Sequence, residues 1–174
     1  KFSVDMIYLA YEEMLDHFND FCDLAEKYGF KLIVGIVTGW MSGRMFAPPA
    51  LEGRHTYTDP VSLRFQIKLV TGIVKRFKDK KAIYAWNLGN ECNCMSPCES
   101  REEAFNWSSL IANTIRVNDP SRMVISGMHG LVTEDTENNH WLICDQGEAT
   151  DMLTTHPYAY FVPHCLMDPI NSIR

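Results

Sequence analysis

Apolar positions in the first part of the chain form one helical pattern and one uninterrupted run. Between Tyr11 and Tyr28 the apolar residues recur at helical spacing, which predicts the buried face of a helix. Gly29 follows at the position where a glycine often ends a helix. The run LIVGIV at 32–37 has no alternation, which is typical of a parallel strand buried on both faces.

The same order of helix and then strand follows in the next part of the chain. Asp59 and Pro60 predict the N-cap and first residue of a second helix, whose apolar positions continue to Phe77. A second apolar strand is expected at 82–88, in the stretch AIYAWNL.

A third helix and two further strands are expected in the remaining residues. A capping-box pattern from Ser100 to Glu103 opens the helix, and the strand MVISG is expected at 123–127. The polar stretch after this strand predicts only a short helix near Trp141. The segment MLTTH at 152–156 predicts a last short strand.

Strands that alternate with helices predict an α/β fold with a parallel sheet and right-handed crossovers. The sheet is either doubly wound or closed into a (β/α)8 TIM barrel. The glycine-rich phosphate loops that doubly wound nucleotide folds carry are absent. Polar and aromatic residues instead gather just after the strands, where barrels build their sites. These residues are Thr38, Gly39, Trp40, Asn90, Glu91, Met128, His129, His156 and Tyr158.

Composition and charge narrow the classes of partner. With 174 residues, 46% of them hydrophobic, the chain suits one globular domain. A net charge of −6 without a basic cluster argues against nucleic acid and against a membrane surface. No apolar run is long enough to span a bilayer. A neutral polymer such as a sugar is compatible with this balance. The start lacks a signal-peptide pattern, and neither secretion nor a cytoplasmic location is indicated.

Three of the six cysteines stand close together in the stretch CNCMSPC, at Cys92, Cys94 and Cys98. Their spacing is not the paired C-x-x-C of a zinc site. Free thiols or a local disulfide are therefore the favoured interpretations, ahead of a metal site.

The candidate chemistry lies at the end of the strand at 82–88. Glu91 follows an apolar and tryptophan-containing run, and apolar surroundings raise the pKa of a carboxyl group. A carboxylic acid that keeps its proton near neutral pH can protonate a poor leaving oxygen. The neighbouring Asn90 amide can donate a hydrogen bond to a substrate hydroxyl.

The motif WNLGNE at 86–91 resembles the fourth-strand motif of clan A glycoside hydrolases, particularly families 5 and 2. This resemblance implies that Glu91 is the acid/base of a retaining mechanism and that Asn90 contacts the 2-hydroxyl of a sugar. The segment THPYAYF resembles the sixth-strand His-x-Tyr of the same families, which implies that His156 and Tyr158 line the cleft and orient the nucleophile. Trp40 follows the strand at 32–37, which corresponds to the third strand of the family's barrel. It is a candidate stacking platform for a sugar ring.

The resemblance also exposes a missing group. A retaining glycosidase needs two carboxylates about 5 Å apart, and the family places its nucleophile, a Glu, on the seventh strand. In the numbering of the family's eight-stranded barrel, the resemblance covers about the second helix to the sixth strand, which is nearly the whole of this chain. We therefore expect residues 1–174 to be a partial catalytic barrel domain without its first and last βα units. The nucleophile is then expected beyond Arg174.

The sequence thus predicts a glycosidase that hydrolyses a β-linked oligo- or polysaccharide with retention, without a metal or organic cofactor. The alternative is a non-catalytic carbohydrate-binding barrel segment or scaffold. A barrel isomerase or aldolase would need a strand-end lysine or a metal cluster, and the sequence indicates neither. The incomplete barrel leaves strand edges uncovered, so we expect this polypeptide alone to be poorly soluble or to self-associate.

Each candidate residue also has a purely structural interpretation. Glu91 can be a solvated carboxylate after a strand-end turn, and His156 a hydrogen-bonded core histidine. Tyr158 can be a half-buried aromatic, and Trp40 can pack over the end of the barrel. His129, just after the expected strand at 123–127, is a further candidate to line the cleft, with a purely structural role as the alternative.

Overall fold

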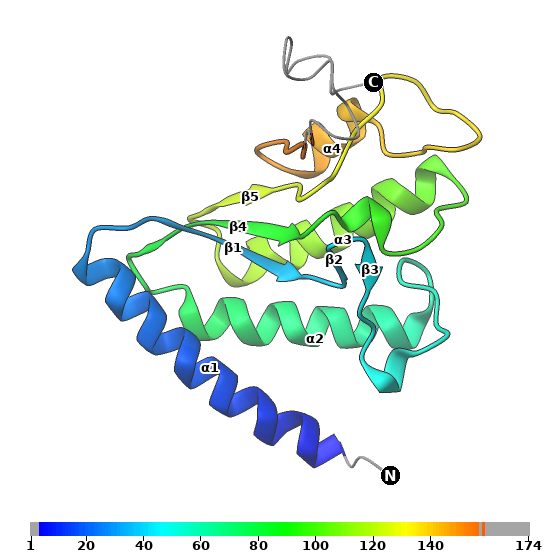
Figure 1. The fold of residues 1–174 in the computed structure, drawn as a ribbon. Coiled ribbons are helices and arrows are strands. Elements are labelled where there is room, and N and C mark those ends of the chain that lie inside the picture. Colours follow the sequence, from blue (N-terminus) through cyan, green and yellow to red (C-terminus); the bar gives the residue numbers. More distant parts are fainter. Residues whose placement is uncertain (1–3, 157, 159–174) are drawn as a thin grey trace.

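Three parallel strands, with helices packed against them, form the centre of the molecule in this computed structural model (Figure 1). The structure describes residues 4–156 and 158. The helices are α1 (Val4–Lys27), α2 (Pro60–Phe77), α3 (Arg101–Asn118) and α4 (Ile143–Ala149), with the 3-10 turns η1 (Pro49–Leu51) and η2 (Cys92–Cys94). The strands are β1 (Leu32–Val37), β2 (Trp40–Met41), β3 (Arg44–Met45), β4 (Ile83–Gly89) and β5 (Met123–Ile125).

The sheet has the strand order β1-β4-β5, with every pair parallel, as the alternation of helices and strands predicts. The strand β4 therefore lies in the middle, with Gly35 of β1 opposite Asn87 and Ile125 of β5 on the other side of Asn87. α2 packs against α3 and β1, and α3 also packs against β4 and α4. This arrangement places the end of β4 between the ends of its two neighbours.

The last predicted strand, at 152–156, is wrong as a strand. Only Met152 forms a bridge with Ile125, in the parallel sense. Just beyond it, side chains interrupt the backbone ladder, since the Thr154 hydroxyl accepts from the Met128 amide and the Ser126 hydroxyl accepts from the Thr154 amide, each at 3.0 Å. The segment still runs beside β5 and continues the order of the sheet.

The strand β1 is not buried on both faces, which corrects the prediction for 32–37. Ile36 and Val37 are buried, but the Ile33 side chain is 56% exposed. The reason is that β4 is the one strand paired with β1 among the described residues. Phe21, Leu24 and nearby apolar side chains line an apolar groove of about 320 Å³ beside β1. The expected self-association stays a prediction.

The predicted helix ends are confirmed. The Asp59 side chain caps α2 by accepting from the amides of Val61 and Ser62, at 2.9 and 3.0 Å. Ser100 caps α3 by accepting from the Glu103 amide at 3.2 Å. Gly29 follows α1 with a φ of +73°, the left-handed conformation that a glycine adopts readily. No helix in the described part of the chain is both long and apolar enough to cross a bilayer.

A largely buried ion pair fixes the start of β5 beside β4. Asp119 is 2% exposed and accepts from the Trp86 indole at 2.9 Å and from Arg122 at 2.6 Å. The Arg122 guanidinium also donates to the Ile83 carbonyl at 2.8 Å. Burial alone would raise the pKa of Asp119, but hydrogen bonds from Ser121, Trp86 and Arg122 outweigh it and hold the pKa at about 2. The carboxylate is thus ionised near neutral pH.

Replacing Asp119 by Ala should lower the free energy of unfolding by about 3 kcal/mol, because it removes the carboxylate that neutralises the largely buried Arg122 guanidinium and leaves the Trp86 indole N–H without its acceptor. The matched variant Asp119→Asn keeps the shape but does not titrate. Since the folded pKa of about 2 lies below the ordinary 3.8, the wild type has an extra ~2 kcal/mol above about pH 4 that disappears as the pH falls through 2. In urea unfolding, the difference in the free energy of unfolding between wild type and Asp119→Asn should shrink as the pH falls through this range. A difference that stays constant with pH would contradict the lowered pKa of Asp119.

Candidate active site

Glu91 leaves the end of β4 in a backbone conformation that ordinary residues rarely adopt. Its φ of +48° and ψ of +49° lie in the left-handed region, which costs a non-glycine residue about 1 kcal/mol or more. The following amide, of Cys92, donates to the Gly127 carbonyl at 3.0 Å and ties the turn to the segment after β5. The carboxylate is consequently turned inward, and Glu91 is only 6% exposed.

Two glycines allow the strand ends to approach closely enough for this turn. A Cβ on Gly89 would lie 1.8 Å from the Val37 carbonyl oxygen, and one on Gly127 would lie 2.2 Å from Asn87 Oδ1. Gly127 also has a φ of +67°. Since no side chain fits at either position, the convergence of β1, β4 and β5 around Glu91 requires glycine at both.

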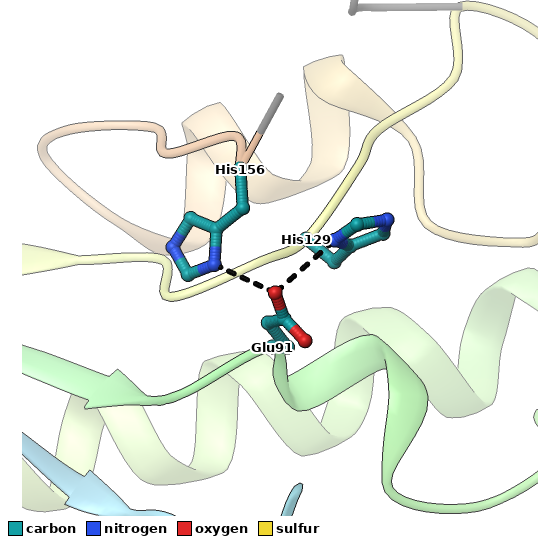
Figure 2. A group of neighbouring side chains, drawn as sticks. All are labelled: Glu91, His129 and His156. Atoms are coloured by element: carbon teal, nitrogen blue, oxygen red, sulfur yellow. Dashed lines mark hydrogen bonds and ion pairs between the residues drawn. The ribbon is translucent and has the colours of Figure 1, made fainter. Parts of the chain in front are cut away.

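Three hydrogen-bond donors meet one oxygen of the Glu91 carboxylate. Its Oε1 atom lies 3.0 Å from His156 Nδ1 and 3.2 Å from His129 Nδ1, and it accepts from the Tyr158 hydroxyl at 2.9 Å. Figure 2 shows the two imidazoles reaching the carboxylate from separate segments of the chain. The ring of Tyr158 stacks against that of His129 with centroids 5.8 Å apart. The structure therefore brings Glu91, His156 and Tyr158 together, which removes the solvated interpretation of Glu91.

The pKa of Glu91 differs from the sequence-based expectation. Burial does raise it, but hydrogen bonds from His156, Tyr158 and His129 outweigh burial, so that the pKa lies below its usual value. The expectation of a raised pKa considered only the apolar strand before Glu91. The polar donors that reverse the shift come from residues far away along the chain.

Asn90 and Trp40 are neighbours on the side of the site that faces β1. The Asn90 side-chain amide donates to the Trp40 backbone carbonyl at 2.8 Å. The Trp40 side chain is partly buried and packs against the hydrophobic core. Its packing role is therefore clear, and a role as a sugar platform stays a prediction.

The turn after Glu91 is held in place from two further directions. The Tyr57 hydroxyl donates to the Cys92 carbonyl at 2.6 Å and accepts from the Ser96 amide at 3.2 Å. On the other side, Asn93 Oδ1 accepts from the His129 amide at 2.8 Å. These bonds connect the loops after β4 and β5, so that the histidine and the carboxylate are positioned by one network.

Solved structures with this fold are β-mannanases and related enzymes. The endo-1,4-β-mannanase from Rhizomucor miehei superposes with a TM-score of 0.68 at 17% identity, over 82% of this chain and 48% of that one. The endo-β-1,4-mannanase from Thermotoga petrophila gives 0.66 at 20% identity, over 80% of this chain and 36% of that one. At such identities the likeness shows the fold, which is part of a TIM barrel, as predicted.

Sequence comparisons place the chain more narrowly. Residues 48–123 match the glycoside hydrolase 42 family of β-galactosidases. Mannan endo-1,4-β-mannosidase F from Aspergillus clavatus is 34% identical over 128 residues, which cover 71% of this chain and 29% of that protein. The enzyme named mannan endo-1,4-β-mannosidase A from Podospora anserina is 28% identical over 140 residues, which cover 78% of this chain and 32% of that protein.

The chain is a clan A glycoside hydrolase segment. It is of the mannanase-like kind found in family 5, and it spans between 29% and 32% of the length of the two curated relatives. The family resemblance predicted from WNLGNE and the His-Pro-Tyr motif is thereby confirmed. The roles of the individual site residues stay proposals.

Two features of this glycosidase segment were missed or left open by the sequence. His129 was only a candidate for the cleft, and the structure places it beside Glu91, because the segment after β5 continues alongside the end of β4 and bonds the turn there through the Gly127 carbonyl. The sequence also indicated no metal cluster at the strand ends, yet Glu91, His129 and His156 bring three potential ligand atoms within 4.8 Å of one another. The signal that could have found both is the position of each histidine just after a parallel strand segment.

The cysteine cluster takes no part in a disulfide. The five cysteines that the structure describes are free thiols, which rules out the local disulfide in CNCMSPC. Cys92 is fully buried and its pKa is raised by burial. Burial and the Glu91 carboxylate together raise the pKa of Cys94 to about 11, so this thiol stays protonated near neutral pH. Cys165 lies outside the described residues.

Replacing Gly127 by Ala should destabilise the fold and displace Glu91. The added methyl would clash with Asn87 Oδ1 and the Gly89 carbonyl, and the positive φ adds strain. We expect a loss of about 2 kcal/mol or more in the free energy of unfolding. Gly130→Ala is the matched control, because nothing lies within 4 Å of its added methyl. Its effect should stay within about 0.5 kcal/mol. If urea unfolding gave the same loss of free energy for both variants, the close contact of Gly127 with Asn87 and Gly89 would be contradicted.

Proposed function

We propose that this chain supplies the acid/base half of a retaining β-glycosidase that acts on a β-linked mannan-type glycan. The observation that carries the proposal is the inward-facing Glu91 carboxylate at the end of β4, 6% exposed and bonded by His156 and Tyr158. The curated relatives named mannan endo-1,4-β-mannosidases support the choice of substrate.

In the proposed mechanism Glu91 protonates the glycosidic oxygen and later removes a proton from the attacking water. The reaction needs a second carboxylate about 5 Å away, which attacks the anomeric carbon. A negative charge at that distance also raises the pKa of Glu91, because like charges disfavour each other. The lowered pKa of Glu91 thus reflects burial and the three donors alone, and the proposed second carboxylate would raise it.

His156 and Tyr158 are proposed to orient the nucleophile or the sugar. In this structure both bond Glu91 Oε1, at 3.0 and 2.9 Å. A phenolic hydroxyl has only one proton to donate, so Tyr158 can serve one carboxylate at a time. A nucleophile within reach would compete for that proton, which frees Glu91 to take up its own.

Asn90 and Trp40 are the proposed sugar contacts on the side of β1. The Asn90 amide has two N–H groups, and one of them donates to the Trp40 carbonyl. The second N–H of Asn90 would donate to the 2-hydroxyl of the sugar, and this hydrogen bond strengthens in the oxocarbenium-like transition state. Trp40 would add stacking against the sugar ring.

A non-catalytic carbohydrate-binding role is the second candidate. It is favoured by the lowered pKa of Glu91, since an ionised carboxylate accepts hydrogen bonds from sugar hydroxyls but cannot protonate a leaving group. A glutamate at the end of the next strand of the parent polypeptide separates the two candidates, because only the enzyme needs it.

Replacing Glu91 by Gln in the polypeptide that contains the whole barrel should abolish most turnover of unactivated β-mannan. We expect a fall in kcat of about 10²–10⁴-fold, the usual contribution of a general acid or base. Aryl mannosides with a good leaving group need no proton in the first step, so covalent intermediate should accumulate in a burst. Glu137→Gln, an exposed carboxylate in the loop before α4, is the matched control and should retain full activity.

Two measurements decide the outcome. Reducing-sugar release from mannan gives kcat for each variant, and a stopped-flow burst with an aryl mannoside separates the first step from the second. Unchanged turnover of mannan by Glu91→Gln removes this residue from the mechanism. Mannan binding by the wild type without turnover would favour the carbohydrate-binding role.

A further inference from the structure

We propose that Glu91, His129 and His156 form a binding site for one divalent transition-metal ion of the zinc type. The three side chains converge from different segments, after β4, after β5 and after Met152 (Figure 2). Of the groups of three or more potential ligands searched among the described residues, this is the one whose ligand atoms meet, all within 4.8 Å of one another. The binding of the ion does not rest on the proposed hydrolytic function.

The spacing of the ligand atoms fits a tetrahedral ion. Zinc binds nitrogen and oxygen ligands at about 2.0–2.2 Å, which places tetrahedral ligand atoms roughly 3.3–3.5 Å from one another. Glu91 Oε1 already lies 3.2 Å from His129 Nδ1 and 3.0 Å from His156 Nδ1. Both separations are slightly shorter than a tetrahedral ion requires, and the three ligand atoms all lie within 4.8 Å of one another, so the two rings would turn outward to admit an ion between them.

The chemistry of the ligands selects the class of metal. Two imidazoles and one carboxylate suit Zn²⁺, Co²⁺ or Ni²⁺, whereas Mg²⁺ and Ca²⁺ prefer oxygen ligands throughout. Three protein ligands leave a fourth position for water. The side chains of His129 and His156 are 38% and 28% exposed, so the ion has a route from solvent.

The ligands are held in place before any ion binds. The His129 amide donates to Asn93 Oδ1, and the His156 amide donates to the His129 carbonyl, both at 2.8 Å. The Glu91 turn is fixed by the bond from the Cys92 amide to the Gly127 carbonyl. Because these backbone bonds do not involve the ligand atoms, an ion can take the carboxylate and imidazoles without disturbing the turns.

An ion at this position would block acid/base chemistry. A carboxylate that coordinates a cation cannot carry the proton for a glycosidic oxygen, and the ion would fill the space beside it. The site is therefore inhibitory towards hydrolysis and not a cofactor site. This consequence, unlike the binding itself, rests on the proposed function.

The test is a direct titration with Zn²⁺ and with Co²⁺ of the polypeptide that contains the whole barrel, because residues 1–174 alone are expected to be poorly soluble or to self-associate. Calorimetry should show one ion per chain, and bound Co²⁺ should show the intense d–d absorption of a tetrahedral nitrogen and oxygen site. His129→Ala and His156→Ala should each weaken binding by at least the ~10–100-fold that loss of an outer-shell partner costs. The control, His17→Ala, removes an exposed histidine on α1 and should bind as the wild type does.

The spectrum of the wild type keeps the test valid even where a variant fails to fold. Absence of binding, equal binding by the wild type and both histidine variants, or equal binding of Mg²⁺ would overturn the site. Strong sulfur-to-cobalt charge transfer would assign the ion to cysteines and overturn it as well. Zinc binding without any mannan hydrolysis by the whole-barrel polypeptide would leave the metal site standing and count only against the proposed hydrolytic function.

Discussion

The site depends on how closely the end of β4 approaches the end of β1 and the segment after β5. Gly89 meets the Val37 carbonyl and Gly127 meets Asn87, at distances that leave no room for a Cβ. The bond from the Cys92 amide to Gly127 then fixes Glu91 in its left-handed turn. Backbone packing, and not the side-chain bonds of the carboxylate, therefore sets the direction in which Glu91 points. The histidines meet a carboxylate whose position is already determined.

The electrostatics of the site follow from an imbalance between donors and acceptors. One oxygen of Glu91 faces three donor groups, from His129, His156 and Tyr158. This excess stabilises the ionised carboxylate and lowers its pKa despite burial. An added group that accepts hydrogen bonds or carries negative charge would relieve the excess, whereas a cation would replace the donors altogether. A second carboxylate would thus raise the pKa of Glu91, whereas a metal ion would stabilise its ionised form.

The sequence predicted the fold well wherever the signal was local. The caps at Asp59 and Ser100, the turn at Gly29 and the apolar run of β4 each depend on neighbours along the chain, and the structure has them as expected. The expected strand at 152–156 failed because hydroxyl side chains take over its hydrogen bonds. Burial of β1 on both faces failed because burial depends on which strands lie beside it, and the sequence pattern does not contain that information.

The same distinction explains the outcome at the site. The two motifs, around Glu91 and at 155–161, were enough to select Glu91, His156 and Tyr158 as residues of one cleft, but not to predict that His156 and Tyr158 bond Glu91 itself, and the sign of the Glu91 pKa shift was wrong. Against burial, the shift is decided by His156, Tyr158 and His129, which approach from 38 to 67 positions further along the chain. A strand-end carboxylate in a barrel should therefore be assigned a protonation state only after the neighbouring strand ends are known. For Glu91, the neighbours in this chain favour the anion, so a proton donor here requires a further negative charge close by.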